Sequence, residues 1–98
     1  FVINSGGIKY FPEMIEKKIT MHEDCTFVVC GVPDPVLFQK IAIVFEQSKP
    51  KNTKEMFREL TKYERPKYIF CLKKFQRTNG KINRNMVQKQ VLKIFNEN

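Results

Sequence analysis

Short apolar runs separated by turn residues predict a chain that alternates strands and helices. Residues 1–10 contain two extended pieces around a serine and two glycines, and adjacent glycines allow the positive φ of a tight turn. A helix is predicted over roughly residues 12–21, because Pro12 suits a first helical turn and Ile15 and Ile19 lie four positions apart. The apolar residues that we expect on its buried face are Met14, Ile15, Ile19 and Met21.

Two apolar runs in the middle of the chain predict strands. Residues 25–32 are β-branched or apolar without polar alternation, which is typical of a central strand covered on both faces. Pro33 and Pro35 should end this strand, since proline cannot donate a hydrogen bond inside a sheet. Residues 40–46 predict a second strand.

A second helix is predicted over residues 53–62, with Thr53 as its N-cap. Pro66 prevents this helix from continuing, because proline lacks the amide that a helix interior needs. The residues of its predicted buried face are Met56, Leu60 and Tyr63.

A third strand, a basic loop and a final helix complete the pattern. Residues 67–72 predict the strand, and residues 73–81 predict a loop with a tight turn at Asn79 and Gly80. The last helix should begin near Asn83, and its apolar side is formed by Val87, Val91, Ile94 and Phe95.

Together these elements predict an α+β fold. We expect a small central three-stranded sheet flanked by helices, with an N-terminal two-stranded hairpin. A length of 98 residues allows one domain, and an apolar content of 42% supplies a modest core. The sequence predicts no transmembrane segment, because its apolar runs are too short to cross a bilayer.

A net charge of +8 points to three classes of partner, namely nucleic acid, an anionic membrane surface or an anionic small ligand. The lysines are spread along the chain, which disfavours a dedicated nucleic-acid arm. Nine phenylalanines support a small basic RNA-binding module as an alternative, but such a sheet needs exposed aromatic residues on adjacent strands. A stand-alone adaptor domain without catalysis is a further alternative.

Cysteine, histidine and serine give little support to metal or hydrolytic chemistry. Cys25, Cys30 and Cys71 are odd in number without a repeated spacing, so we expect buried free thiols in a reducing compartment such as the cytoplasm. His22 with Cys25 and Cys30 would lack regular spacing and a fourth ligand, so no metal site is predicted. His22 suits a surface or capping role, and Ser5 has no base partner in the sequence.

The most informative segment is residues 77–84, in which Lys81 follows an asparagine–glycine turn. It is not a P-loop, because that motif needs a glycine where Phe75 stands and a serine or threonine where Ile82 stands. Lys81 is therefore either an ordinary solvated lysine or a cation that the turn projects toward an anionic centre on another domain.

The order of Thr78, Gly80, Lys81, Ile82 and Arg84 is similar to a motif near the end of adenylate-forming acyl-CoA synthetases, threonine–x–glycine–lysine–isoleucine–x–arginine. Further motifs of that family match in order and spacing, so the resemblance covers nearly the whole chain. They are Ser5-Gly6-Gly7 with Pro12 and Ile15-Glu16, then Gly31-Val32-Pro33-Asp34, then Leu60 to Pro66-Lys67 with its tyrosine–x–x–proline segment.

The sequence also departs from the family pattern. Phe38 and Gln39 stand where the family usually has glycine and glutamate, and Met14 replaces the first glutamate of a glutamate–isoleucine–glutamate motif. The opening stretch, residues 2–7, looks closest to the o-succinylbenzoate–CoA ligases of menaquinone synthesis.

The resemblance implies that residues 1–98 are the C-terminal lid domain of an AMP-forming acid–CoA ligase, with the N-terminal domain and hinge absent. Such enzymes join a carboxylic acid to ATP and then pass the acyl group to coenzyme A, and the lid rotates between the two steps. Lys81 is implied as the catalytic lysine of the first step, supported by Thr78 and Gly80 in its turn. The residues implied in substrate or coenzyme A binding are Ser5, Gly6, Gly7, Arg65, Lys67, Lys73 and Lys74.

ATP, Mg²⁺ and coenzyme A are the implied cofactors, and the N-terminal adenylation domain would bind most of the ATP and the Mg²⁺. That domain and a carboxylic acid are the expected partners, whereas nucleic acid is not expected. The identity of the acid is left open, because its pocket would lie in the other domain. We expect the 98-residue piece alone to be inactive, and Arg84 to be structural and paired with an acidic group.

Overall fold

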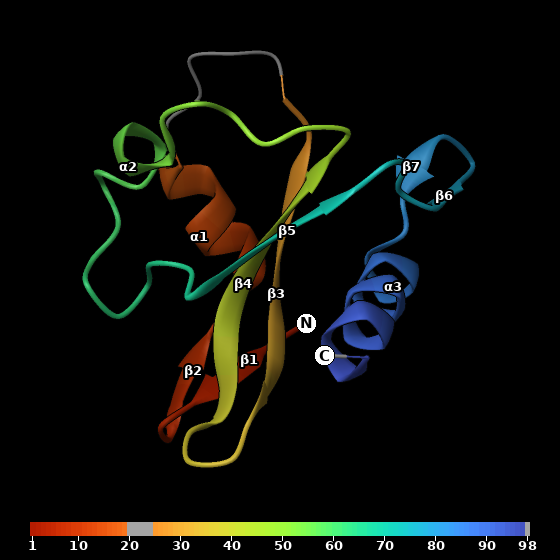
Figure 1. Ribbon diagram of the computed structural model, residues 1–98. Helices are drawn as coiled ribbons and strands as arrows, with labels where there is room; N and C mark the ends of the chain where they lie inside the picture. Colours follow the sequence, from red (N-terminus) through yellow and green to blue (C-terminus); the bar gives the residue numbers. More distant parts are fainter. Residues whose placement is uncertain (20–24, 98) are drawn as a thin grey trace.

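The computed structural model describes residues 1–19 and 25–97. Its centre is a sheet of three strands, β3 (Phe27–Asp34), β4 (Phe38–Glu46) and β5 (Tyr68–Leu72). Strand β4 is antiparallel to β3 along its whole length and parallel to β5 over its second half. Figure 1 shows α1 (Pro12–Lys18) and α2 (Thr53–Met56) on one side of this sheet and α3 (Arg84–Asn96) on the other.

An N-terminal hairpin extends the sheet. Strands β1 (Ile3–Ser5) and β2 (Ile8–Tyr10) are antiparallel, and β1 meets β4 through the pairing of Ser5 with Phe38. The strand order is therefore β2-β1-β4-β3, with β5 also on β4. The α+β fold with a three-stranded centre and an N-terminal hairpin is thus confirmed.

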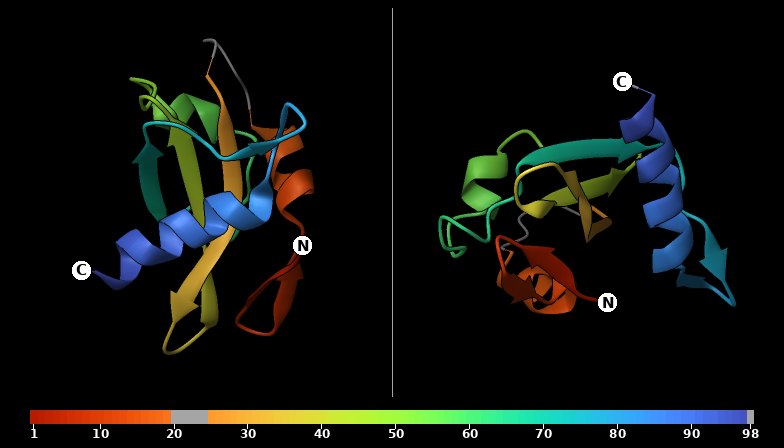
Figure 2. Two further views of the ribbon diagram at one scale, coloured as in Figure 1. Left: turned by 90° about the vertical axis from the view of Figure 1, so that its right-hand side faces the viewer. Right: turned by 90° about the horizontal axis from the view of Figure 1, so that it is seen from below.

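The sheet separates two apolar clusters, and alternate residues of β4 contribute to each. Ile41, Ile43 and Phe45 belong to the cluster that contains α1 and the chain around α2. Ala42 and Val44 belong to the cluster of α3 on the opposite face. Figure 2 shows the two helical layers from two further directions. The remaining buried residues of the α3 cluster are Val28, Cys30, Val32, Leu72, Phe75, Val87 and Val91.

Strand β3 corrects one prediction and confirms another. Its residues Val28, Val29 and Val32 are buried, and they face both clusters as predicted. The strand is not central, however, because β4 is its only partner among the described strands. An edge position tolerates proline, so β3 continues through Pro33 to Asp34 instead of ending before it.

The helix predicted over residues 53–62 is much shorter in the structure. Helix α2 covers only Thr53–Met56, and its N-cap is Asn52 rather than Thr53. The side chain of Asn52 accepts a hydrogen bond of 3.2 Å from the amide of Glu55. A turn then brings Phe57 and Leu60 into the core, whereas Tyr63, predicted on the buried face, is 70% exposed.

The predicted first helix also needs correction. Helix α1 ends at Lys18, and Ile15 and Ile19 are buried as predicted. Met14 is 60% exposed because its side chain lies outside the face that meets the sheet. Met21 and His22 lie outside the described residues. In the part of the chain that is described, no three metal-ligating side chains gather.

Helix α3 covers the aromatic residues of β5. Tyr68 and Phe70 stack at a centroid distance of 6.2 Å, and Phe95 of α3 meets Tyr68 edge-on at 5.4 Å. This helix begins after Asn83 and buries Val87 and Val91, as predicted. Within residues 1–19 and 25–97, no helix is long and apolar enough to cross a membrane.

Phe38, at the start of β4, has a φ of 77°, although side chains with a Cβ rarely adopt this left-handed backbone. The ring is 70% exposed, so its packing does little to explain the conformation. The sequence pattern that this stretch resembles has glycine at this place, and glycine adopts positive φ without a clash. The backbone thus keeps a conformation suited to glycine while the side chain has changed.

We expect Phe38→Gly to raise the free energy of unfolding by about 1 kcal/mol relative to Phe38→Ala, because glycine relieves the left-handed conformation. Chemical denaturation of both variants measures the difference. Alanine is the matched control, since it removes the same ring but keeps the Cβ. Equal stability of the two variants would contradict a strained backbone at this position.

Candidate active-site lysine hairpin

Lys81 lies on a second, separate hairpin. Strands β6 (Arg77–Thr78) and β7 (Lys81–Ile82) are antiparallel, and Thr78 pairs with Lys81. Asn79 and Gly80 form the turn with φ values of 54° and 80°, the pattern of a tight two-residue hairpin. The predicted turn is present. The segment predicted as a loop, residues 73–81, contains β6 and the start of β7, and strands of two residues are too short to show a periodic pattern in the sequence.

The Lys81 ammonium group is exposed, and no carboxylate of the described chain forms an ion pair with it. The side chain borders an open hollow beside the start of α3. The residues that line this hollow are Phe1, Thr78, Lys81, Ile82, Asn83, Arg84 and Asn85. A positive group is therefore available for an anion that comes from outside this domain.

One side of the lysine hairpin, residues 77–82, is fixed by Glu46 at the end of β4. Both carboxylate oxygens accept hydrogen bonds from the Arg77 guanidinium, at 2.7 and 2.8 Å. The amide of Phe75 donates to the same carboxylate at 2.7 Å. These hydrogen bonds, that of Arg77 first, lower the pKa of Glu46 to about 2. Neither Glu46 nor Arg77 was singled out from the sequence, because 31 positions separate them.

The other side is fixed by Glu16 of α1. Its two carboxylate oxygens accept hydrogen bonds from the two terminal nitrogens of Arg84, one of them at 2.8 Å. The amide of Val29 also donates to Glu16 at 2.8 Å, so the pair joins α1, β3 and α3. The hydrogen bond to Glu16 raises the pKa of Arg84. Arg84 is thus paired with an acidic group, as the sequence led us to expect.

The glycine turn lies between β1 and β2, with φ values of 61° at Gly6 and 83° at Gly7. The amide of Gly6 donates a hydrogen bond of 2.9 Å to the carbonyl of Leu37, in the connection between β3 and β4. Asp34 holds that connection, because its carboxylate accepts from the amide of Leu37 at 2.7 Å. Ser5 is the last residue of β1 rather than part of the turn.

The structure does not bring the glycine turn and the lysine hairpin together. Figures 1 and 2 show the β1–β2 hairpin and the β6–β7 hairpin well apart in all three views. An added Cβ at Gly7 would meet no atom of the described residues within 4 Å, so this position of the turn faces open space. The two candidate elements can therefore act on different groups, or at different times.

The four basic residues implied in coenzyme A binding fall into two groups. Arg65 and Lys67 precede β5, whereas Lys73 and Lys74 follow it, and all four are exposed. A strand of five residues is about 17 Å long, so the two groups lie at opposite ends of β5. One compact phosphate group cannot contact both.

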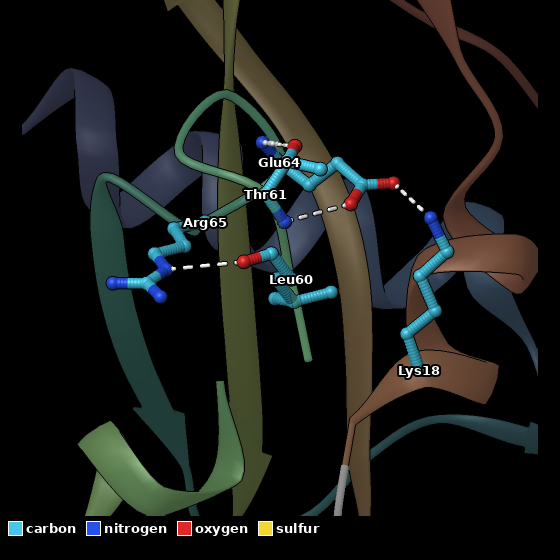
Figure 3. A network of polar contacts seen from close by, with 5 residues as sticks. All are labelled: Lys18, Leu60, Thr61, Glu64 and Arg65. Carbon is cyan, nitrogen blue, oxygen red and sulfur yellow. Dashed lines mark hydrogen bonds and ion pairs between the residues drawn. The ribbon is translucent and has the colours of Figure 1, made fainter. Parts of the chain in front are cut away.

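Arg65 belongs to a polar network that stiffens the chain between α2 and β5 (Figure 3). Its Nε donates a hydrogen bond of 3.3 Å to the carbonyl of Leu60, and its terminal nitrogens point away from that contact. Glu64 accepts from Lys18 at 2.7 Å and from the amide of Thr61 at 2.9 Å. Burial opposes the ionisation of Glu64, but these hydrogen bonds outweigh it and lower the pKa.

Comparison with known proteins assigns a class to this fold. No family model matches the chain, and no curated protein sequence matches it. Solved structures do match. An acyl-CoA synthetase (AMP-forming)/AMP-acid ligase II-like protein from Dyadobacter fermentans is 33% identical, with a TM-score of 0.77, over 90% of this chain and 29% of that one. A fatty acyl CoA synthetase from Mycobacterium tuberculosis shares the fold at 22% identity and a TM-score of 0.79, over 95% and 20% of the two chains.

The Mycobacterium structure shows the shared fold alone, whereas the likeness to the Dyadobacter protein supports a place for the chain in the adenylate-forming superfamily, among the AMP-forming acyl-CoA synthetases. One of the similar proteins is the o-succinylbenzoate CoA synthetase MenE from Bacillus subtilis, as a double mutant bound with its product analogue OSB-NCoA. It is 26% identical with a TM-score of 0.72, over 90% of this chain and 20% of that one. The likenesses support the class and not one particular member. The chain spans less than a third of the length of each of these proteins.

The low pKa of Glu46 predicts an acid-sensitive hairpin. A carboxylate with a depressed folded pKa stabilises the fold above its ordinary pKa, and this stabilisation is lost as the pH falls through the folded value. We therefore expect Glu46→Gln to unfold more easily at neutral pH, and to lose less stability than the unsubstituted chain between pH 4.5 and about 2.

Denaturation at a series of pH values measures this difference. The matched control is Glu59→Gln, since Glu59 is 62% exposed and forms only a 3.5 Å ion pair with Arg58. The same pH dependence in Glu46→Gln and in the unsubstituted chain would refute a role for the Glu46–Arg77 pair in stability.

Proposed function

We propose that this chain is the C-terminal lid domain of an AMP-forming acid–CoA ligase. The observation that carries the proposal is the exposed Lys81 ammonium on a turn fixed at both sides, in a fold shared with AMP-forming acyl-CoA synthetases. The 33% identity over 90% of the chain supports this class over the basic RNA-binding module. The packing of α3 against β5 also favours this class, because Phe95 covers Tyr68 and the aromatic residues of the strand are not free to stack on RNA bases.

In the first reaction, a carboxylate oxygen of the acid attacks the α-phosphorus of ATP. The bond from that phosphorus to the bridging oxygen of pyrophosphate breaks, and pyrophosphate leaves with the electron pair. Negative charge develops on the phosphate oxygens, where a positioned ammonium group lowers the barrier. We assign this role to Lys81, with Thr78 and Gly80 supporting its turn.

We assign the binding of the carboxylic acid, of most of the ATP and of its Mg²⁺ to the N-terminal domain of the complete ligase. In the part of this chain that the structure describes, no three His, Cys, Asp or Glu side chains gather that could hold a metal ion. The contribution of this chain to adenylation is then one cation and its orientation.

In the second reaction, the thiol of coenzyme A attacks the acyl carbonyl, and AMP leaves. We assign Ser5 and the turn at Gly6 and Gly7 to this step, because glycine lets the backbone approach a narrow pantetheine passage without a Cβ. The separation of this turn from Lys81 supports a lid that rotates between the two steps.

The phosphates of coenzyme A are assigned to the exposed basic residues on either side of β5, with Arg65 and Lys67 as one contact and Lys73 and Lys74 as the other. The finer proposal for the acid is o-succinylbenzoate, a precursor in menaquinone synthesis. This proposal is supported by the 26% identity to MenE and by the amino-acid sequence of residues 2–7, which resembles the start of this domain in o-succinylbenzoate–CoA ligases.

The first test is Lys81→Ala in the complete enzyme. We expect the turnover number for adenylation, followed by pyrophosphate release, to fall by about 100-fold or more, because a charge-stabilising donor is lost. Thioester formation from supplied acyl-adenylate should change little. Lys89→Ala is the matched control, since Lys89 is an exposed lysine of α3. Equal slowing of both reactions would contradict the role of Lys81.

The second test is Gly7→Leu. We expect adenylation to be retained and thioester formation to be blocked, because an added Cβ at Gly7 meets no described atom within 4 Å and the leucine side chain would extend into the space proposed for pantetheine. Gly7→Ala is the control, since both variants bear the same backbone penalty at a φ of 83° and differ in bulk. Thioester formation by Gly7→Leu at the rate of Gly7→Ala would remove the glycine turn from this step.

A further inference from the structure

Asn83 makes four hydrogen bonds where β7 passes into α3, and in one of them its carbonyl accepts from the amide of Val87 at 3.0 Å, as in an ordinary first helical turn. Its Oδ1 accepts from the amide of Met86 at 3.1 Å and so caps the helix. Its Nδ2 donates to the hydroxyl of Thr78 across the lysine hairpin at 3.0 Å. Its own amide donates to the carbonyl of Gln76 at 2.9 Å. One side chain thus joins the helix start to the strand opposite Lys81.

The lysine hairpin needs such a connection. In the described structure, β6 and β7 pair only with each other and stand apart from the main sheet. Two strands of two residues are too short to hold an orientation alone. The direction of Lys81 therefore depends on the contacts at the two sides of the hairpin.

These two contacts reach the neighbouring residues Arg77 and Thr78 of β6 from different parts of the domain. The Glu46–Arg77 ion pair holds β6 to the end of β4. The contact of Asn83 with Thr78 fixes the angle between the hairpin and α3, and Arg84, the next residue, fixes α3 to Glu16. Without the contact of Asn83, the hairpin can swing about its Arg77 side while α3 stays in place.

We propose that Asn83, acting through Thr78, is a positioning residue that sets the orientation of Lys81. The catalytic consequence rests on the proposed role of Lys81 in adenylation. A misplacement of about 1 Å at a reacting centre can cost about 100-fold in rate, so a looser hairpin should slow the step that uses the lysine. Asn83 itself need not touch the substrate.

Thr78→Val is the decisive variant, because it removes the hydroxyl but keeps the branched shape and leaves the Asn83 cap of α3 intact. In the complete enzyme we expect the kcat for adenylation to fall about 10-fold, with the KM for ATP, the melting temperature and thioester formation from supplied acyl-adenylate unchanged. Thr78→Ser restores the hydroxyl and should restore the rate. The matched control is Thr61→Val, since the Thr61 hydroxyl accepts only the local bond from Glu64 at 3.3 Å.

A second measurement does not depend on activity. Hydrogen exchange of the amides in residues 77–82 of the complete protein should become faster in Thr78→Val, whereas exchange in α3 should stay the same. Unchanged exchange in the hairpin would overturn the positioning role whatever the kinetics show. Faster exchange in the hairpin with an unchanged kcat for adenylation would overturn the proposal that the orientation set by Asn83 matters for catalysis.

Lys81→Ala separates this inference from the proposed function. If Lys81→Ala abolishes adenylation but Thr78→Val does not slow it, the positioning role of Asn83 is wrong and the function stands. If Lys81→Ala leaves adenylation intact, the proposed function and the catalytic part of the inference both fall. Hydrogen exchange then still decides whether Asn83 holds the hairpin.

Discussion

The ion pair between Glu16 and Arg84 connects the parts of the domain that would otherwise be independent. Glu16 receives both terminal nitrogens of Arg84 and the amide of Val29, so one carboxylate links a helix on one face of the sheet to the helix on the other. Both side chains are mostly buried, and burial raises the pKa of the neighbouring Cys30 to about 12, with the charge of Glu16 adding to the effect. In such surroundings a charge left without its partner is costly, so each residue requires the other.

The same chemistry recurs on the far side of the lysine hairpin, where Glu46 receives Arg77 and the amide of Phe75. Each arginine–carboxylate pair is bidentate, which fixes direction as well as distance. The sheet and its two apolar clusters supply a rigid body, and these two pairs transmit that rigidity to a short hairpin outside it. The exposed lysine thus extends from a hairpin that is held at both sides.

Much of this arrangement could be predicted from local sequence. The turns at Gly6 and Gly80 and the start of α3 at Asn83 were found because glycine, asparagine and helical spacing act over a few residues. The wrong or missing predictions concern features that depend on tertiary packing or on residues far apart in the sequence. The continuation of β3 through Pro33 depends on its edge position, and the early end of α2 depends on where Phe57 can reach the core. The partners Glu16 and Glu46 lie 68 and 31 positions from their arginines, and no local pattern records such a pairing.

That separation of 68 positions also bears on the order in which the domain folds. Contacts between distant residues form late, because a long loop must close before they are gained. A chain made from its N-terminus can build the hairpin of β1 and β2 and the pairing of β3 with β4 early. Glu16 and the amide of Val29 must then wait for Arg84, which follows Glu16 by 68 positions. The lysine hairpin can consequently acquire its native orientation only after the start of α3, which carries Arg84, has been synthesised.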